Sequence, residues 1–274
     1  MTCQNCGDTR QENYCPACGE KKFHPKSLHL KHYAEETLEG LFHFDNKFFR
    51  TLKTLVVRPG QLTLDYVEGR RVRHMRPFEL FVIVNLVAFF ALLTNPFSIP
   101  LKNYVTYTPF TNFNTVERVN AKVAAEGISY GEYERRFNAS AHGASKTLLI
   151  VFIPVYTLLC GLLLINKKRT AVEHLLFATH YIAFVLVAFL LTMYLVMLPL
   201  ELIFGSSNAI EYDFITVLYF SFVFCAYLFF AVKRFYKTKM WQTLLTAALV
   251  GLNFFTLLVF YRMLLFDLIL RFGR

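Results

Sequence analysis

Charged side chains are scarce in this chain, and tryptophan is nearly absent. Charged residues make up 18% of the 274 positions and tryptophan occurs once, whereas 55% of the residues are hydrophobic and 30 are phenylalanine. A water-soluble domain rarely combines so few charges with so much phenylalanine, so the composition argues against a single soluble core. It is typical of helices that face lipid and its interfaces.

Recognisable catalytic motifs are lacking as well. The sequence has no HExxH pair, no phosphate-binding glycine loop, no Ser/His/Asp set and no paired acids within its apolar runs. It therefore points away from an enzyme, although enzymatic activity is left open. The net charge of +10 is found in membrane proteins as well as in nucleic-acid-binding proteins. Nucleic acid is not an expected partner of so apolar a chain.

Five apolar runs are long enough to cross a hydrocarbon core, which needs about 20 helical residues. Because lipid cannot satisfy backbone groups, each run should be helical. The sequence thus predicts an all-α membrane protein with about five transmembrane helices. The first run begins too late for a cleaved signal peptide, so the polar segment before it should be retained. The runs are Phe78–Phe97, Thr147–Ile165, Leu175–Phe204 with a bend at Pro199, Phe214–Val232 and Trp241–Tyr261.

Basic residues lie at alternate ends of these runs. They gather at 70–76, 167–169 and 233–239, whereas the connection at 205–213 has none. Basic loops mark the cytoplasmic side, so we expect a multi-pass protein with a cytoplasmic N-terminus. Five spans would place the C-terminus outside, and an interfacial last run would return it to the cytoplasm.

The chain divides into three parts by composition. Residues 1–23 hold four cysteines, residues 24–77 form amphipathic juxtamembrane helices and a basic collar, and residues 78–274 form the membrane domain. Its outer loop, 98–146, should be a small helical cap with an N-cap at Ser129. Helices are expected at Leu28–Glu39 and from Asp45 to Val57. The apolar face of the second could lie in the membrane interface or pack on the protein itself.

The N-terminal cysteines have the spacing CxxC-x8-CxxC. Two such knuckles can direct four thiolates to the corners of a tetrahedron around Zn²⁺, which leaves no position open for a substrate. We therefore expect a structural zinc ribbon, with disulfides, an iron–sulfur centre or redox-active pairs as alternatives. A reducing cytoplasmic side disfavours disulfides. The predicted ligands are Cys3, Cys6, Cys15 and Cys18.

A basic collar directly precedes the first run, in the stretch "RPGQLTLDYVEGRRVRHMRPFELF". Leu62 to Val67 can form a short helix that ends at Gly69. Cations beside a membrane attract anionic headgroups, so the collar could dock lipid or a protein partner. A plain orientation signal is the alternative. The collar cations are Arg70, Arg71, Arg73 and Arg76.

Three polar residues near the start of the third run form a candidate intramembrane site. Glu173 and His180 are seven residues apart and share a helix face, with His174 on the adjacent stripe. A histidine within a membrane helix is a functional candidate by default. A hydrogen bond from His180 to Asn85 or a tyrosine, metal or haem ligation, and a proton relay are the interpretations left open.

The four-cysteine ribbon, the collar, "SKTLLIVFIPVYTLL" and "EHLLFATHYIAF" occur in this order. Together they resemble a domain-of-unknown-function family of zinc-ribbon inner-membrane proteins of Bacteroidota. The resemblance covers nearly the whole chain and implies a bacterial inner membrane with a cytoplasmic ribbon, but no activity. Its collar matches are Tyr66, Gly69, Arg70, Arg71 and Pro77, and its third-run matches are Glu173, His174 and His180.

These features favour a non-enzymatic adaptor or scaffold that docks a partner or anionic lipid at the cytoplasmic face. The alternative is a small transporter or channel-like protein with a polar path near His180 and Glu173. A membrane enzyme with a second metal at Glu173, His174 and His180 is a third hypothesis.

Overall fold

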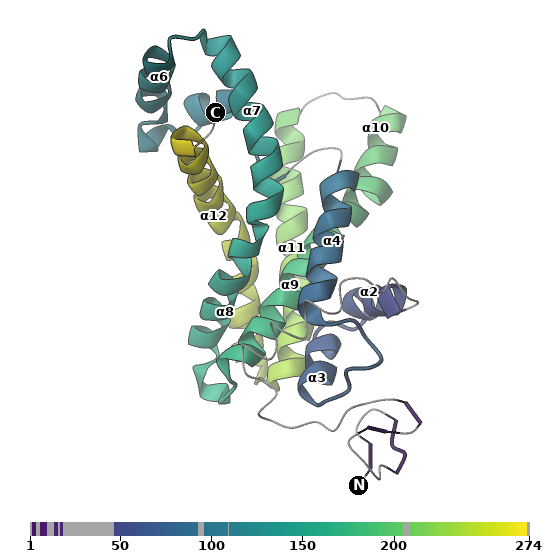
Figure 1. Cartoon of the computed structure of the whole chain (residues 1–274). Coiled ribbons are helices and arrows are strands. Elements are labelled where there is room, and N and C mark those ends of the chain that lie inside the picture. Colours follow the sequence, from purple (N-terminus) through teal and green to yellow (C-terminus); the bar gives the residue numbers. More distant parts are fainter. Residues whose placement is uncertain are drawn as a thin grey trace. The chain divides into compact units, whose positions relative to one another are not determined.

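The computed structural model describes residues 2–3, 6–9, 14–15, 17–18, 47–92, 96–108, 110–204 and 209–272 (Figure 1). The helix expected at Leu28–Glu39 lies outside these residues. Within the described ranges every secondary-structure element of three or more residues is a helix, and Thr2 and Thr9 form an isolated β-bridge. The prediction of an all-α chain is confirmed for these ranges.

The described helices run in chain order through two compact units. Unit one comprises Met1–Ala91 and Phe152–Leu252, and unit two comprises Leu92–Val151 and Asn253–Arg274. The elements are α2 (Lys47–Val57), α3 (Gln61–Val67), α4 (Pro77–Ala91), α5 (Leu101–Thr106), η2 (Phe110–Phe113), α6 (Thr115–Glu126), α7 (Tyr130–Thr147), η3 (Leu148–Val151), α8 (Phe152–Leu163), η4 (Ile165–Lys167), α9 (Ala171–Thr192), η5 (Met193–Met197), α10 (Leu198–Phe204), α11 (Ala209–Tyr236) and α12 (Met240–Phe272).

Three of the described helices are long and apolar enough to cross a membrane, and a bent pair would make a fourth. The three are Ala171–Met197, Thr216–Tyr236 and Met240–Phe272, and the pair is Tyr130–Ser145 with Leu148–Leu163. Five spans were expected. The first run forms α4, whose 15 residues reach only about 22 Å. The chain is therefore a membrane protein with three or four candidate spans by length and composition.

Helix α9 is the centre of unit one. Nearly every side chain from Glu173 to Phe189 is buried, and α4 and α8 both pack against it. A helix that is apolar all round is stable only when neighbours cover every face. Its start is fixed by a capping box, in which the Thr170 hydroxyl accepts from the Glu173 N–H and Glu173 bonds back to the Thr170 N–H. Near its end, the π-helical turn η5 leads into α10, which contains Pro199.

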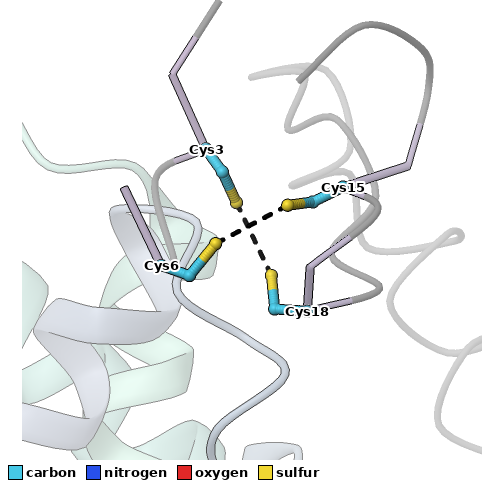
Figure 2. Close-up of side chains that lie close together, drawn as sticks. All are labelled: Cys3, Cys6, Cys15 and Cys18. Carbon is cyan, nitrogen blue, oxygen red and sulfur yellow. Dashed lines mark hydrogen bonds between the residues drawn. The ribbon is translucent and has the colours of Figure 1, made fainter. Parts of the chain in front are cut away.

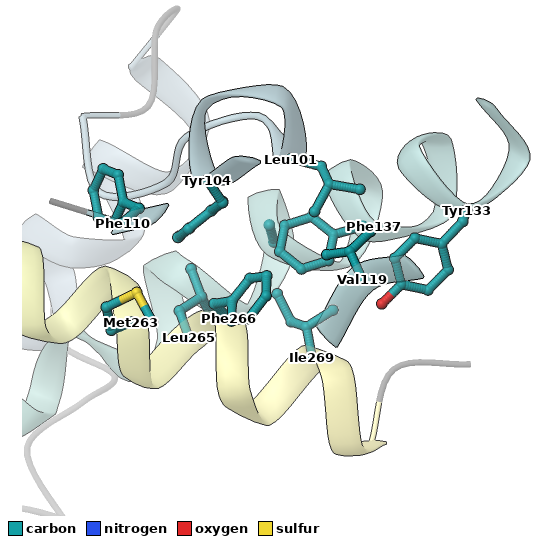
Figure 3. Close-up of a cluster of buried hydrophobic side chains, with 11 residues drawn as sticks. Leu101, Tyr104, Phe110, Val119, Tyr133, Phe137, Met263, Leu265, Phe266 and Ile269 are labelled. Carbon is teal, nitrogen blue, oxygen red and sulfur yellow. The ribbon is translucent and has the colours of Figure 1, made fainter. Parts of the chain in front are cut away.

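Unit two is built from the expected outer loop and the end of α12. The loop forms α5, η2, α6 and α7, and Ser129 caps α7 by accepting from the Glu132 N–H, as predicted. The sequence also allowed the fifth run to continue beyond Tyr261 as an interfacial helix. This C-terminal part of α12 instead contributes Met263, Leu265, Phe266 and Ile269 to a buried cluster with side chains of the loop (Figure 3). The loop members are Leu101, Tyr104, Phe110, Val119, Tyr133, Phe137 and Ala141.

Candidate functional site

The four N-terminal cysteines converge on one point (Figure 2). Their sulfur atoms lie within 4.8 Å of one another, with 3.6 Å between Cys3 and Cys18 and between Cys6 and Cys15. The first knuckle is closed by backbone bonds from Cys3 N to Asp8 O and from Gly7 N to Cys3 O. Gly7 has a φ of 80°, which a residue with a side chain rarely adopts.

This geometry fits a tetrahedral metal ion held by four thiolates. Ligands about 2.3 Å from a central zinc would lie about 3.8 Å apart, close to the observed 3.6 Å. A disulfide would need sulfur atoms about 2.05 Å apart, so the observed 3.6 Å excludes a disulfide within either pair. Among the described residues, this is the group of cysteine, histidine and acid side chains that could hold a metal ion. Four protein ligands would leave no coordination position for a substrate.

The collar begins with a turn that packs directly on α11. Gly60 has a φ of 77°, and a Cβ atom there would lie 2.6 Å from the carbonyl oxygen of Ala231. The guanidinium of Arg234 donates to the carbonyl of Pro59 at 2.6 Å. Only glycine permits both this conformation and this approach. The Pro59–Gly60 turn therefore fixes the start of α3 against α11.

Helix α3 is held on α9 by a buried polar pair. The hydroxyl of Thr63 and Nδ1 of His180 are 2.9 Å apart, and the two residues are 1% and 4% exposed. A hydrogen bond of His180 to Asn85 or a tyrosine was one expectation, but the bond found is with Thr63. The predicted end of α3 is correct, because Gly69 follows it with a φ of 87°.

Two of the four collar arginines are engaged by the collar itself. Arg70 forms ion pairs with Asp65 and Glu68, both at 2.6 Å. Burial disfavours its charge, but the hydrogen bonds and charges of the two acids outweigh burial and raise the pKa of Arg70. Arg71 lies 4.5 Å above the Tyr66 ring and donates to the Tyr66 carbonyl at 3.1 Å.

Asp65 organises the centre of the collar, although the sequence analysis did not single it out. Its Oδ1 accepts from Gln61 at 2.7 Å and from Arg70, and its Oδ2 lies 3.6 Å from Nε2 of His74. Burial lowers the pKa of His74 against the opposing effect of Asp65. The one available signal was an isolated acid between the apolar Leu64 and Tyr66, in an otherwise basic segment.

The other two collar arginines lie next to the start of α4. Arg73 is exposed, and Arg76 is partly buried. The backbone N–H of Arg76 donates to the Glu79 carboxylate at 3.4 Å, so Glu79 occupies the N-terminus of α4. An acid there is stabilised by the helix dipole.

The three polar residues of the third run do not converge on one site. Glu173 caps α9 and pairs with Arg169 at 2.8 Å. Nδ1 of His174 is 2.8 Å from the Tyr236 hydroxyl of α11, and the two rings stack. His180 bonds to α3. His174 and His180 thus join α9 to α11 and α3, whereas Glu173 is engaged at the start of α9 itself.

The three basic segments lie at the same end of unit one. Arg169 donates to the Phe235 carbonyl at 3.1 Å, and Lys167 donates to the Lys237 carbonyl at 3.4 Å. Arg234 reaches the Pro59 carbonyl, in the turn that begins the collar. The grouping that the sequence predicted from loop charges is therefore present as a contact in space.

One family model matches the chain. It is described as a protein of unknown function (DUF3667) and covers residues 45–89. No curated protein matches the chain, and no solved structure matches it. The matched residues contain α2, α3, the collar and most of α4. Residues 45–89 of this chain are thus similar to a domain of unknown function, and they include the segment that docks on α9 and α11.

Proposed function

We propose that this chain is a non-enzymatic adaptor or scaffold of the bacterial inner membrane. In this proposal the N-terminus is cytoplasmic, Cys3, Cys6, Cys15 and Cys18 hold a structural zinc ion, and the ribbon recruits a protein partner. Zinc would supply the folding energy of a segment too short for its own core. The basic end of unit one would face the cytoplasm, in accordance with the loop-charge rule.

The observation that carries the proposal is how the collar uses its polar groups. Thr63, Asp65, Arg70 and Arg71 bond within the collar or to α9, and Gly60 packs on α11. These contacts hold the segment on α9 and α11, two of the candidate membrane-spanning helices. A rigid juxtamembrane platform joined to a closed metal site suits the recruitment of a partner.

The alternative of a small transporter with a polar path near His180 and Glu173 is less well supported. His180 bonds to Thr63 of α3, and Glu173 bonds to Thr170 at the cap of α9. The transporter hypothesis predicts that His180→Ala abolishes flux in reconstituted vesicles while the protein remains folded.

The adaptor hypothesis can be tested by capture from native membranes. A Cys15→Ser/Cys18→Ser variant should lose both its zinc, expected at about one ion per chain, and its co-purifying partner. Cys225→Ala is the matched control, since this thiol belongs to α11 and not to the cluster. A partner retained without the ribbon cysteines would contradict the proposal.

A further inference from the structure

The segment between α3 and α4 folds back onto α2. The backbone N–H of Met75 donates to the Thr51 hydroxyl at 3.0 Å, and both residues are buried. This bond brings residues 73–76 alongside Arg50, which precedes Thr51 on α2. The charges of Arg50 and Arg73 both act on the His74 ring and lower its pKa, in addition to the larger effect of burial. A cation of α2 and a cation of the segment before α4 therefore both lie near the His74 ring.

Two nitrogen atoms in this cluster are buried and lack a partner. In the part of the chain that the structure describes, neither Nη1 of Arg76 nor Nδ1 of His74 has a hydrogen-bond partner. Asp65 lies beside the other ring nitrogen of His74 and already accepts from Gln61 and Arg70. Buried polar nitrogen atoms are normally satisfied. These two point to a ligand whose acceptor oxygens bind the Arg76 guanidinium and, when the ring is protonated, the Nδ1–H of His74.

We propose that Arg50, Arg73, His74 and Arg76 bind the phosphate of an anionic phospholipid headgroup. Guanidinium groups match phosphate oxygens in geometry and charge. The inference rests on the proposed function only in placing this end of unit one at the membrane surface. Arg70 and Arg71, which the sequence analysis had included among the docking residues, are not part of the site because Asp65, Glu68 and Tyr66 already bind them.

The outer face of α2 favours a lipid over a soluble phosphate. Phe49 and Val57 are 70% and 66% exposed, and the cationic Lys53 lies between them on the helix. The helix contains no acidic residue. Exposed apolar side chains interleaved with cations are typical of a helix at an anionic membrane surface. The buried face of α2, with Phe48 and Leu55, packs on the protein. In this proposal one face of the helix packs on the protein and the opposite face lies at the membrane interface.

The site can be tested with a fluorescent reporter, because the chain has a single tryptophan. The full chain carrying Trp241→Phe and Phe49→Trp would be reconstituted in phosphatidylcholine vesicles with increasing brominated phosphatidylglycerol or brominated phosphatidylcholine. The indole introduced on α2 should be quenched preferentially by the anionic lipid. The preference should fall about tenfold in Arg73→Gln/Arg76→Gln. Arg135→Gln, at an exposed arginine of α7, should retain it.

Each outcome of this experiment decides something. Equal quenching by the two lipids, or a preference that survives Arg73→Gln/Arg76→Gln, would overturn the proposal. Loss of the preference in millimolar inorganic phosphate would support a phosphate site but overturn its assignment to lipid. If the double variant fails to fold, the exposed Arg73→Gln alone still tests the claim, with a smaller expected loss. A partner is absent from these vesicles, so failure here is separate from failure of the adaptor role.

A pH series gives a second readout. An anion beside His74 favours the protonated ring, and the pKa of His74 is lowered from its ordinary value by burial. Lipid preference should therefore increase as the pH falls from about 7 to about 5. His74→Gln should remove this dependence. The other charged or titratable groups whose charges interact with His74 are Asp65 of α3, Arg50 of α2, Arg73 of the same segment and His180 of α9. A pH dependence that persists in His74→Gln would assign it to another titratable group, such as Asp65 or His180, and contradict the role of His74.

Discussion

Gly60 is the residue that lets the collar approach α11 most closely. Its positive φ is one demand on this position, and the 2.6 Å that would separate a Cβ atom from the Ala231 carbonyl oxygen is another. A left-handed conformation costs a residue with a side chain about 1–2 kcal/mol, and a steric contact with backbone adds to that cost.

Gly60→Ala should therefore destabilise unit one by more than the conformational cost alone, by at least about 2 kcal/mol. Gly127→Ala is the matched control, since Gly127 also has a positive φ but no atom within 4 Å of its Cβ position. Unfolding in mixed micelles with increasing denaturing detergent would measure both. Equal losses in the two variants would show that the close approach to Ala231 contributes nothing.

Thr63 and His180 make a second residue-scale prediction. Thr63→Val keeps the shape of the side chain but leaves the buried His180 ring without its partner, at a cost of about 1–3 kcal/mol. Thr63→Ser keeps the hydroxyl and should lose less. The same detergent titration applies. A Thr63→Val protein as stable as the parent would mean that the hydrogen bond does not hold α3 on α9.

At the scale of single residues, the sequence identified candidate functional residues better than it identified their hydrogen-bond partners. His180 stood out because a histidine is rare in an apolar run, but its partner lies 117 positions earlier in the chain. Asp65 was overlooked because its spatial neighbours, such as His74, and not its spacing in the sequence, make it part of a network. The four cysteines were predictable because their spacing itself encodes the two knuckles.

At the scale of elements, α12 combines a candidate membrane span with a C-terminal part that packs in the core of unit two. Its 33 residues extend about 50 Å, whereas a hydrocarbon core needs about 30 Å. All charged residues of α12 lie in its final third, namely Arg262, Asp267 and Arg271. Asp267 pairs there with Arg118 of α6 at 2.5 Å. That third belongs to the core of unit two rather than to a lipid-facing surface.

Phe266→Ala tests this assignment. The side chain is fully buried between Tyr104 and Phe137, with ring centroids 5.0 and 5.8 Å away. Its removal should destabilise unit two by about 3–5 kcal/mol and increase amide hydrogen exchange in α5 to α7. Phe272→Ala, at a side chain that is 77% exposed, is the control and should change little. Unchanged exchange in Phe266→Ala would place the core elsewhere.

Some elements could be predicted from local sequence patterns, and others could not. The runs that form α9, α11 and α12, the cap at Ser129 and the end of α3 at Gly69 follow from hydropathy, capping and glycine chemistry. The role of the last third of α12 could not be predicted, because "RMLLFDLILRF" is equally compatible with an interfacial helix. Its partners are side chains of residues 101–141, and neither segment has a local sequence pattern that identifies a partner so far away in the chain.

For the whole molecule, the grouping of the basic segments at one end of unit one underlies the proposed orientation. We expect a cytoplasmic N-terminus. With the three unbroken candidate spans, the C-terminus would then lie on the other side of the membrane. A fluorescent protein fused before Met1 should fluoresce, and alkaline phosphatase fused after Arg274 should be active. An inactive phosphatase fusion, with a C-terminal fluorescent fusion that is bright, would instead require an even number of crossings.

The adaptor role makes the central claim, and its most direct test is a photo-crosslink from the ribbon in native membranes. Tyr14 lies beside Cys15 and is 58% exposed, so a photoreactive residue there should contact whatever the ribbon binds. We predict a discrete protein adduct that disappears in Cys15→Ser/Cys18→Ser. The same probe at Tyr107, which is 53% exposed in unit two, should not give that adduct. No adduct at Tyr14, or one that persists without the cysteines, would contradict the account.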